Sequence, residues 1–403
     1  MSGRVLGTKI RRLLALTVAG AAVLASGEAR TQASQPKPDK AHPLWEMDLH
    51  RFGYEQVRQS NSYRPRFYAL DFTANDRLAW AWLTYDGPPT AAQKKYAGFP
   101  QPEPAHLHVL ILDARTGRKL ALHAWPTQSL PVCFFGIGGG KFLTCAGGKL
   151  GLFSPSLAVL REQDLPTPDS LTSLHIGISP TRQTLLISYS QRGLDRVELV
   201  DTNTLAVTAS WTEGGSLTFY GVADRWLVET WGVPPQPCIR PIGGACKPHR
   251  PLGLDTEMLG PMRLVTNVAN DNTLVLEAGR KMVITTPEGT PLLDVSLPKN
   301  RSFGELVASS RGDRFAVMEN RRRGLTIEAL DMYAFGSNDR VVVYSIPCLR
   351  AIYTVKVKGT SPWTPWVIHE NRTALSPDGT LLAIESDSAL KVYALPPANT
   401  FRH

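Results

Sequence analysis

Residues 373–386 read Thr-Ala-Leu-Ser-Pro-Asp-Gly-Thr-Leu-Leu-Ala-Ile-Glu-Ser, and Ala-Leu-Lys-Val-Tyr-Ala-Leu follows at 389–395. The Ser-Pro-Asp-Gly segment has turn chemistry, because proline fixes φ and glycine accepts φ > 0. Apolar and β-branched residues flank this turn on both sides, which is typical of strands. The stretch therefore predicts three short strands near 372–376, 380–385 and 389–395, and it assigns Asp378 to stabilising the turn.

Weaker copies of this hairpin recur along the chain, most of them about 40–46 residues apart. Their centres lie near residues 73, 138, 179, 223, 269 and 309. A second hairpin follows in most units, with turns at 114–117, 201–204, 287–290 and 345–347. Four antiparallel strands per unit and seven units predict an all-β fold: a single seven-bladed β-propeller over residues 44–396.

The last unit has room for three strands before Pro396-Pro397. Its fourth strand must come from elsewhere, because an unpaired edge is a liability. Residues 45–50, Trp-Glu-Met-Asp-Leu-His, are the candidate. We expect this N-terminal segment to close the ring.

The hairpin at 376–379, with Ser179-Pro180 as its clearest echo, resembles the bacterial WD-repeat-like propellers, including those grouped with the amine-dehydrogenase heavy chain. The resemblance covers residues 44–396. No Trp-Asp dipeptide closes a strand, so the eukaryotic-type subfamily is not implied. The resemblance implies a fold and leaves function open, since this architecture carries scaffolds, ligand binders and several enzyme classes.

The N-terminal residues predict export. Arg4, Lys9, Arg11 and Arg12 precede an apolar run from Leu13 to Leu24 and then small residues, the pattern of a signal peptide over 1–29. General secretion is favoured over a twin-arginine signal, and we expect a periplasmic or secreted protein without a membrane span. Residues 30–43 are predicted to be a disordered segment and 397–403 a C-terminal tail.

Charge adds a weaker constraint on partners. Removing residues 1–29 lowers the net charge from +9 to +6, because four basic residues and Glu28 leave. The mature chain is therefore mildly basic, which does not argue for nucleic acid.

Three long segments interrupt the repeats between second and third strands, at 87–105, 231–256 and 319–339. A fourth, at 359–370, joins the last two units. In an up-and-down meander all four lie on one face, and binding residues usually lie on loops carried by a rigid scaffold. The binding-face candidates are basic or aromatic: Tyr96, Phe99, Arg240, His249, Arg321, Arg322, Arg323, Trp363 and Trp366. For each group alone, a solvated or loop-pinning role is the simpler interpretation.

Catalytic and metal-binding patterns are incomplete or absent in the sequence. The Gly-rich segment 136–141 lacks the spacing of a phosphate loop and is interpreted as a hairpin turn. No Gly-x-Ser-x-Gly elbow occurs. His106 and His108 share one strand face, where an ordinary polar surface is favoured over a metal pair. No catalytic residue, cofactor or metal is assigned.

Five cysteines in an exported chain suggest disulfides. Cys133 and Cys145 lie symmetrically about Gly139, and Cys238 and Cys246 flank a short loop. We predict both pairs. Cys348 is left over and is expected to be a buried apolar group at a strand end.

The leading hypothesis is an exported, monomeric, non-catalytic propeller that binds a protein or an anionic glycan through the elaborated face. The alternative is a propeller enzyme, lactonase-like or a dehydrogenase component, with a site at the channel mouth. A structural part in a larger envelope assembly is the third possibility.

Overall fold

The structure is a computed structural model. It describes residues 41–54, 66–87, 103–166, 174–213, 218–231, 236–244, 247–248, 265–270, 273–278, 280–321, 339–357, 367–386 and 388–397. The strands lie within one compact unit, Gln35–His403. The predicted signal peptide lies outside the described residues.

Within the described residues the strands form seven sheets, numbered here in chain order. Sheet 1 contains β2 (Arg66–Ala74), β3 (Arg77–Tyr85), β4 (Pro104–Asp113) and β5 (Lys119–Gln128). Sheet 2 contains β6 (Cys133–Gly138), β7 (Lys141–Ala146), β8 (Lys149–Phe153) and β9 (Val159–Asp164). Sheet 3 contains β10 (His175–Ile178), β11 (Thr184–Gln191), β12 (Leu194–Asp201) and β13 (Val207–Glu213).

The remaining sheets repeat this order. Sheet 4 contains β14 (Thr218–Val222), β15 (Trp226–Trp231), β16 (Gln236–Pro241) and β17 (Lys247–Pro248). Sheet 5 contains β18 (Val265–Asn270), β19 (Thr273–Ala278), β20 (Lys281–Thr285) and β21 (Pro291–Ser296). Sheet 6 contains β22 (Arg301–Ala308), β23 (Arg314–Arg321), β24 (Asp339–Ser345) and β25 (Arg350–Val357). Sheet 7 contains β27 (Thr373–Leu375), β28 (Leu381–Ser386) and β29 (Ala389–Ala394).

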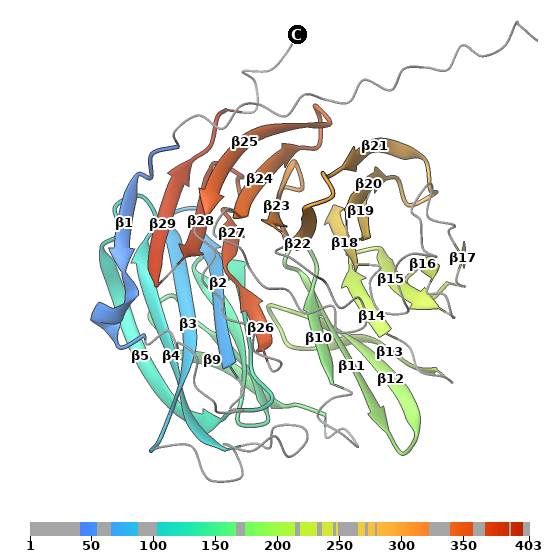
Figure 1. Cartoon of the computed structure of the whole chain (residues 1–403). Coiled ribbons are helices and arrows are strands. Elements are labelled where there is room, and N and C mark those ends of the chain that lie inside the picture. Colours follow the sequence, from blue (N-terminus) through green and yellow to red (C-terminus); the bar gives the residue numbers. More distant parts are fainter. Residues whose placement is uncertain are drawn as a thin grey trace, which may run out of the picture. The chain divides into compact units, whose positions relative to one another are not determined.

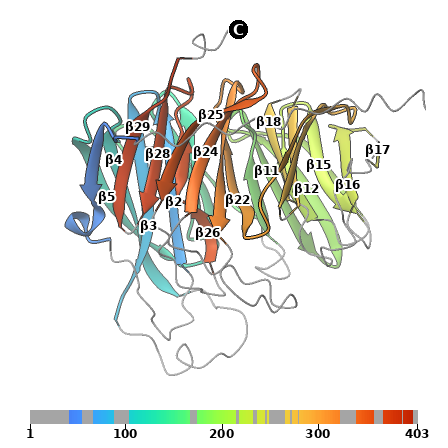
Figure 2. The ribbon, with the colours of Figure 1, turned by 45° about the horizontal axis from the view of Figure 1, so that its top comes forward.

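The first strands of successive sheets lie side by side. β2 contacts β6 and β27, β14 contacts β10 and β18, and β22 contacts β18 and β27. One apolar cluster joins sheets 2 and 3. Four-stranded antiparallel sheets arranged in this way are the blades of a β-propeller, so the predicted all-β propeller with four-stranded antiparallel blades is confirmed (Figures 1 and 2).

Each sheet has two ends. The turn end carries the short hairpins between first and second strands and between third and fourth strands, such as Ala74–Arg77 and Asp113–Lys119. The loop end carries the connections between second and third strands and those that lead to the next sheet. The long connections 86–103, 322–338 and 358–366 all leave from the loop end.

The N-terminal segment closes the ring as predicted. β1 (Trp45–Asp48) pairs antiparallel with β29, with Trp45 opposite Val392 and Asp48 opposite Ala389 (Figure 1). The Trp45 indole donates to the Ala114 carbonyl at 2.9 Å, which ties the strand to the neighbouring sheet 1. The observed strand is shorter than the predicted one, because Leu49 and His50 belong to the 3-10 helix η1 (Leu49–Phe52).

The apolar core lies in the seams, meaning the interfaces between neighbouring sheets. Side chains alternate between the two faces of a strand, so a central strand such as β3 serves two seams. Leu78, Trp80 and Trp82 face sheet 7, and Ala79 and Ala81 face sheet 2. The ring of Tyr54, which follows η1, packs edge-on against Tyr68, Trp80 and Trp82.

Two details differ from the prediction. Residues 231–256 do not form one inserted loop, since β16 and β17 occupy 236–241 and 247–248. The Pro-Trp-rich link contains an unpredicted strand, β26 (Val367–Asn371), which pairs parallel with β2 on its inner edge. The prediction failed because neither segment shows the alternation of a half-buried strand.

Candidate functional site

The hairpins at the turn end satisfy their own polar groups. The Asp378 carboxylate accepts from the Ser376 hydroxyl at 2.7 Å and from the Thr380 amide and hydroxyl at 3.0 and 2.8 Å. Asp113 accepts in the same way from the amide and hydroxyl of Thr116, both at 2.8 Å. The predicted turn role of Asp378 is therefore confirmed, and these acids are engaged in local structure.

The turn-end hairpins also bond to one another across the seams. The bonds are Gly140 N–H to Thr73 O, Lys141 Nζ to Asn203, Thr181 Oγ1 to Asp224, Arg311 N–H to Pro377 O, and Asp378 N–H to Asn75. These contacts consume polar groups that a ligand could otherwise use. At the turn end these hairpins are therefore linked to one another by hydrogen bonds between neighbouring sheets.

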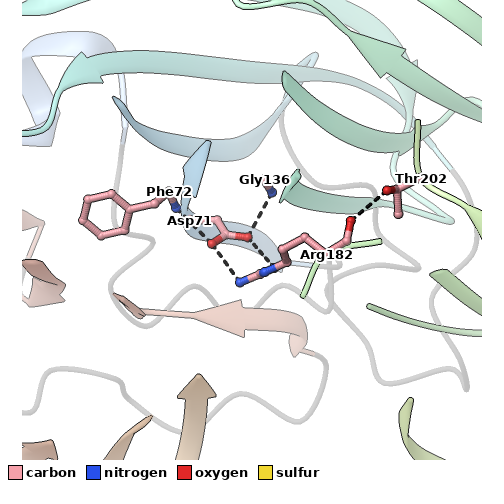
Figure 3. Close-up of polar contacts among 5 residues, drawn as sticks. All are labelled: Asp71, Phe72, Gly136, Arg182 and Thr202. Atoms are coloured by element: carbon pink, nitrogen blue, oxygen red, sulfur yellow. Dashed lines mark hydrogen bonds and ion pairs between the residues drawn. The ribbon is translucent and has the colours of Figure 1, made fainter. Parts of the chain in front are cut away.

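One buried ion pair joins three sheets near the first strands (Figure 3). The guanidinium of Arg182, from the β10–β11 turn, donates to both oxygens of Asp71 in β2 at 2.8 and 3.1 Å. The same carboxylate accepts the amide of Gly136 in β6 and that of Phe72, each at 2.9 Å. Burial raises the pKa of Asp71, while Arg182 and the two amides lower it. Because every lone pair in this contact has a donor, Asp71 acts as a clamp between sheets.

Gly136 is required where sheets 1 and 2 meet. A Cβ at this position would lie 2.3 Å from the Phe72 carbonyl oxygen. Only glycine permits the backbone approach that brings its amide to Asp71. This close approach, and not phosphate binding, accounts for the first glycine of the segment 136–141.

At the loop end, Arg372 links sheets 7, 1 and 6. Its guanidinium donates to the Tyr68 hydroxyl at 2.5 and 3.2 Å, lies over the Tyr68 ring, and approaches the buried Glu385 at 3.7 Å. Its amide donates to Glu305 of β22 at 3.1 Å. These contacts fix the point at which the 358–371 segment enters sheet 7.

The connection 322–338 has a similarly fixed base. Glu319 in β23 is fully buried, and Arg340 in β24 binds one of its carboxylate oxygens at 2.6 Å. The two residues lie opposite each other in the sheet. A buried charge-assisted contact of this kind holds both strand ends in register.

A third set of contacts joins β3 and β4, the strands that flank the connection 86–103. The His108 ring stacks on Trp82 and bonds to the Thr84 hydroxyl at 2.8 Å, and His106 lies 3.4 Å from Asp86. Burial lowers the pKa of His108, and the neighbouring His106 lowers it further. His106 and His108 therefore share a face as predicted, together with aromatic and hydroxyl groups.

Two of the nine predicted binding residues are described. Arg240 lies in β16 near the turn end, over the Trp211 ring at 5.2 Å, so its predicted place in a loop is wrong. Arg321 ends β23 opposite Arg301, directly before the connection 322–338. The other seven lie outside the described residues: Tyr96, Phe99, His249, Arg322, Arg323, Trp363 and Trp366.

The cysteines give one confirmed disulfide. Cys133 and Cys145 are paired residues in β6 and β7 and are bonded. Cys246 lies outside the described residues, so the Cys238–Cys246 pair stays a prediction. The burial predicted for Cys348 is wrong: it is half-buried in the β24–β25 turn, where a hairpin tip leaves no second layer to cover it.

Sequence reasoning missed Arg182, Arg372 and Arg340 because each finds its carboxylate on another strand, and Arg182 finds it on another sheet. No group of three or more His, Cys, Asp or Glu that could hold a metal ion occurs within the described residues. The same part of the chain contains no helix with the length and hydropathy needed to cross a membrane.

No protein-family model matches the chain, and no curated protein matches it. Solved structures resemble it distantly. One is from the mitotic checkpoint complex, at 15% identity and TM-score 0.46, covering 98% of this chain and 100% of that one. Another is streptogramin B lyase, at 13% identity and TM-score 0.46, covering 87% and 98%. A third is the C-terminal WD40 domain of Sif2, at 10% identity and TM-score 0.43, covering 90% and 100%. At these scores the fold assignment rests on the sheets themselves.

Proposed function

We propose that this chain is an exported, monomeric, seven-bladed propeller that binds a partner protein through its loop end and performs no catalysis. The signal-peptide pattern of residues 1–29 supports export, and the seven sheets support the blade number. Membership of the bacterial WD-repeat-like propellers is part of this proposal, and so is the assignment of a protein as the partner.

The anchored bases of the long connections carry the proposal. His108 and Thr84 join the strands that flank the connection 86–103, and Glu319 and Arg340 join those that flank 322–338. Arg372 and Glu305 hold the chain where it leaves β26, the strand that follows the connection 358–366. Polar contacts at all three places hold the strands or strand ends beside the connections, and the Glu319 carboxylate among them is fully buried. A scaffold that fixes loop bases while varying loop sequence is typical of binding surfaces.

The composition of these connections favours a protein as the ligand. Arginine and large aromatic residues are the types enriched at the centres of protein interfaces. Residues 321–323 are three consecutive arginines, and Tyr96, Phe99, Trp363 and Trp366 supply aromatic groups. At the turn end, by contrast, the carboxylates of Asp113 and Asp378 accept hydrogen bonds within their own hairpins.

A matched pair of variants tests the proposal. The loop-end variant replaces Arg321, Arg322 and Arg323 with Ala, and the turn-end control replaces the exposed Arg115, Arg118 and Arg311. Both variants lose three positive charges. Tagged mature protein would be cross-linked in cell-envelope extract of its source organism, and partners quantified by mass spectrometry.

We expect the loop-end variant to lose a partner that the wild type and the control retain, by about tenfold or more, which is the effect of losing one strong hot spot. Equal recovery by both variants, or loss in the control alone, would contradict binding through the loop end.

A further inference from the structure

The exposed large apolar side chains in the described part of the chain are unevenly distributed. Those on sheets 3 and 5 are Leu194, Val207 and Leu292. The others lie on or directly before the outer strands of the consecutive sheets 7, 1 and 2, and we name them the outer patch: Leu44, Leu120, Leu122, Val159 and Leu160. Exposed apolar side chains that gather on one surface mark an interaction site.

Packing between sheets 7 and 1 holds the first part of the outer patch together. Trp45, which follows Leu44, donates its indole N–H to the Ala114 carbonyl at 2.9 Å. A Cβ on Gly117 would lie 2.8 Å from the Trp45 ring, so this ring covers the hairpin that leads to Leu120. Leu44 is therefore held beside the start of β5.

Packing between sheets 1 and 2 holds the second part. The Trp125 ring of β5 lies 5.1 Å from the Phe153 ring of β8 between centroids. Phe153 in turn pairs with Val159 at the start of β9. The outer patch therefore extends over three sheets that are joined by side-chain contacts.

The outer patch lies near the turn end of its strands. In sheets 1 and 2 the outer strand follows directly on a turn-end hairpin, and the patch residues are among its first four. In sheet 7 the outer strand β1 is antiparallel to β29, and the Leu44 N–H donates to the Val392 carbonyl at 2.7 Å. All five apolar side chains are thus at one end of the sheets, away from the long connections.

Positive charge accompanies the outer patch. The exposed cations next to it in the sequence are Arg115, Arg118, Lys119 and Arg161. The acid of the same hairpin, Asp113, accepts three hydrogen bonds within its own turn. This end of the three outer strands is therefore both apolar and basic.

The exposed acids of these strands lie further towards the loop end. They are Glu46, Asp48, Glu162 and Asp164. Glu46 is paired with Lys391 at 3.0 Å, and Glu162 with Lys149 at 3.5 Å. The charges along the outer strands are thus separated, with the unpaired excess of positive charge beside the apolar residues.

We propose that the outer patch docks this protein on the surface of an anionic phospholipid membrane. The leucine and valine side chains enter the boundary between headgroups and acyl chains, and the neighbouring cations bind lipid phosphates. Binding to a membrane surface grows with the apolar area buried and with the attraction of Lys and Arg to anionic lipids. Leucine and valine are under-represented at the energetic centres of protein interfaces, which favours a lipid surface over a protein here.

This docking goes beyond the protein partner proposed above and does not depend on it. The signal-peptide pattern predicts export, a route that brings the mature chain next to a membrane. The long connections leave from the opposite end of the sheets, so a docked propeller still presents its loop end to a partner.

Two matched pairs of leucine substitutions test the docking. The patch variant carries Leu120→Ser and Leu160→Ser, at positions 42% and 50% exposed. The control carries Leu194→Ser and Leu292→Ser on sheets 3 and 5, at positions 46% and 37% exposed. Mature protein is sedimented with vesicles of phosphatidylcholine, either alone or mixed with phosphatidylglycerol. Because all four side chains are exposed, both variants should keep the melting temperature of the wild type.

We expect the wild type and the control to sediment with the anionic vesicles and to remain in solution with phosphatidylcholine alone. The patch variant should bind the anionic vesicles about tenfold or more weakly, because it buries less apolar area. Lys119→Gln with Arg161→Gln should lower the affinity by about tenfold as well. Raising the salt concentration should weaken binding of the wild type.

Three results would overturn the proposal: no sedimentation of the wild type with anionic vesicles, equal binding by the patch variant and the control, or equal binding to both kinds of vesicle. If the wild type binds no vesicles and the patch variant alone loses a cross-linked protein in envelope extract, the outer patch is a protein-docking surface instead.

Discussion

At the turn end Asp113 accepts hydrogen bonds from Thr116, three residues away. In the seams Asp71 accepts them from the guanidinium of Arg182, 111 residues away. The first carboxylate is at the surface and the second is buried. Hairpin acids therefore stabilise one turn each, and seam acids connect whole sheets. Loss of a seam contact should consequently cost far more than loss of a turn contact.

Removal of residues 1–63 should have the largest effect. It deletes β1, which covers β29, and Tyr54, which fills the seam between sheets 7 and 1. Losing one such buried ring costs about 3–5 kcal/mol, and we expect the melting temperature to fall by roughly 10 °C or more in differential scanning calorimetry. A chain beginning at His42 is the control, and equal melting of the two would show that the closing strand is dispensable.

Arg182→Ala tests whether a seam charge connects sheets. It leaves the Asp71 carboxylate buried without its guanidinium, and breaking such a pair costs about 3–5 kcal/mol. Urea unfolding measures the loss. Adding Asp71→Asn should restore part of it, because the amide oxygen still accepts a backbone N–H but carries no charge. A loss below about 1 kcal/mol would place Arg182 with the surface pairs.

Removal of the Cys133–Cys145 disulfide tests how much a covalent link between neighbouring strands stabilises the fold. Cys133→Ala with Cys145→Ala should lower the free energy of unfolding by about 2–3 kcal/mol, since the bond closes a short loop. Cys348→Ala, at a half-buried turn, is the control and should change stability by less than about 1 kcal/mol. Two alkylatable thiols at 133 and 145 in oxidised protein would show that the bond does not form.

The turn-end acid Asp113 should show the smallest effect. Hydrogen bonds from Thr116 lower its pKa, so its contribution is present above the ordinary carboxyl pKa of about 3.9 and is lost as pH falls through the lowered value. Melting temperatures between about pH 2 and 5 should therefore fall slightly more steeply for the wild type than for Asp113→Asn. Parallel curves would remove this turn from the acid response.

Most of the elements that could be predicted from the sequence are those whose interactions are local. The turn at 376–379 and its three strands follow from proline, glycine and alternating apolar residues, and the counting of strands led to the closure by Trp45–Asp48. The strands β16 and β26 were missed, because they lack the alternation of a half-buried strand.

For the candidate site, the sequence located the connections 86–103 and 322–338 as interruptions of a repeat. It could not show that Arg340, Arg372 and His108 anchor their bases, because an isolated arginine or histidine carries no signal for its partner.

By itself, the sequence determined an all-β repeat fold, since hairpin chemistry and strand periodicity act over a few residues. The closing N-terminal strand followed from the count of strands in the last unit. Tertiary structure alone decided which carboxylates are buried and which arginines meet them. Burial and charge pairing depend on residues brought together from separate strands and sheets, and the spacing between such residues along the chain has no fixed period.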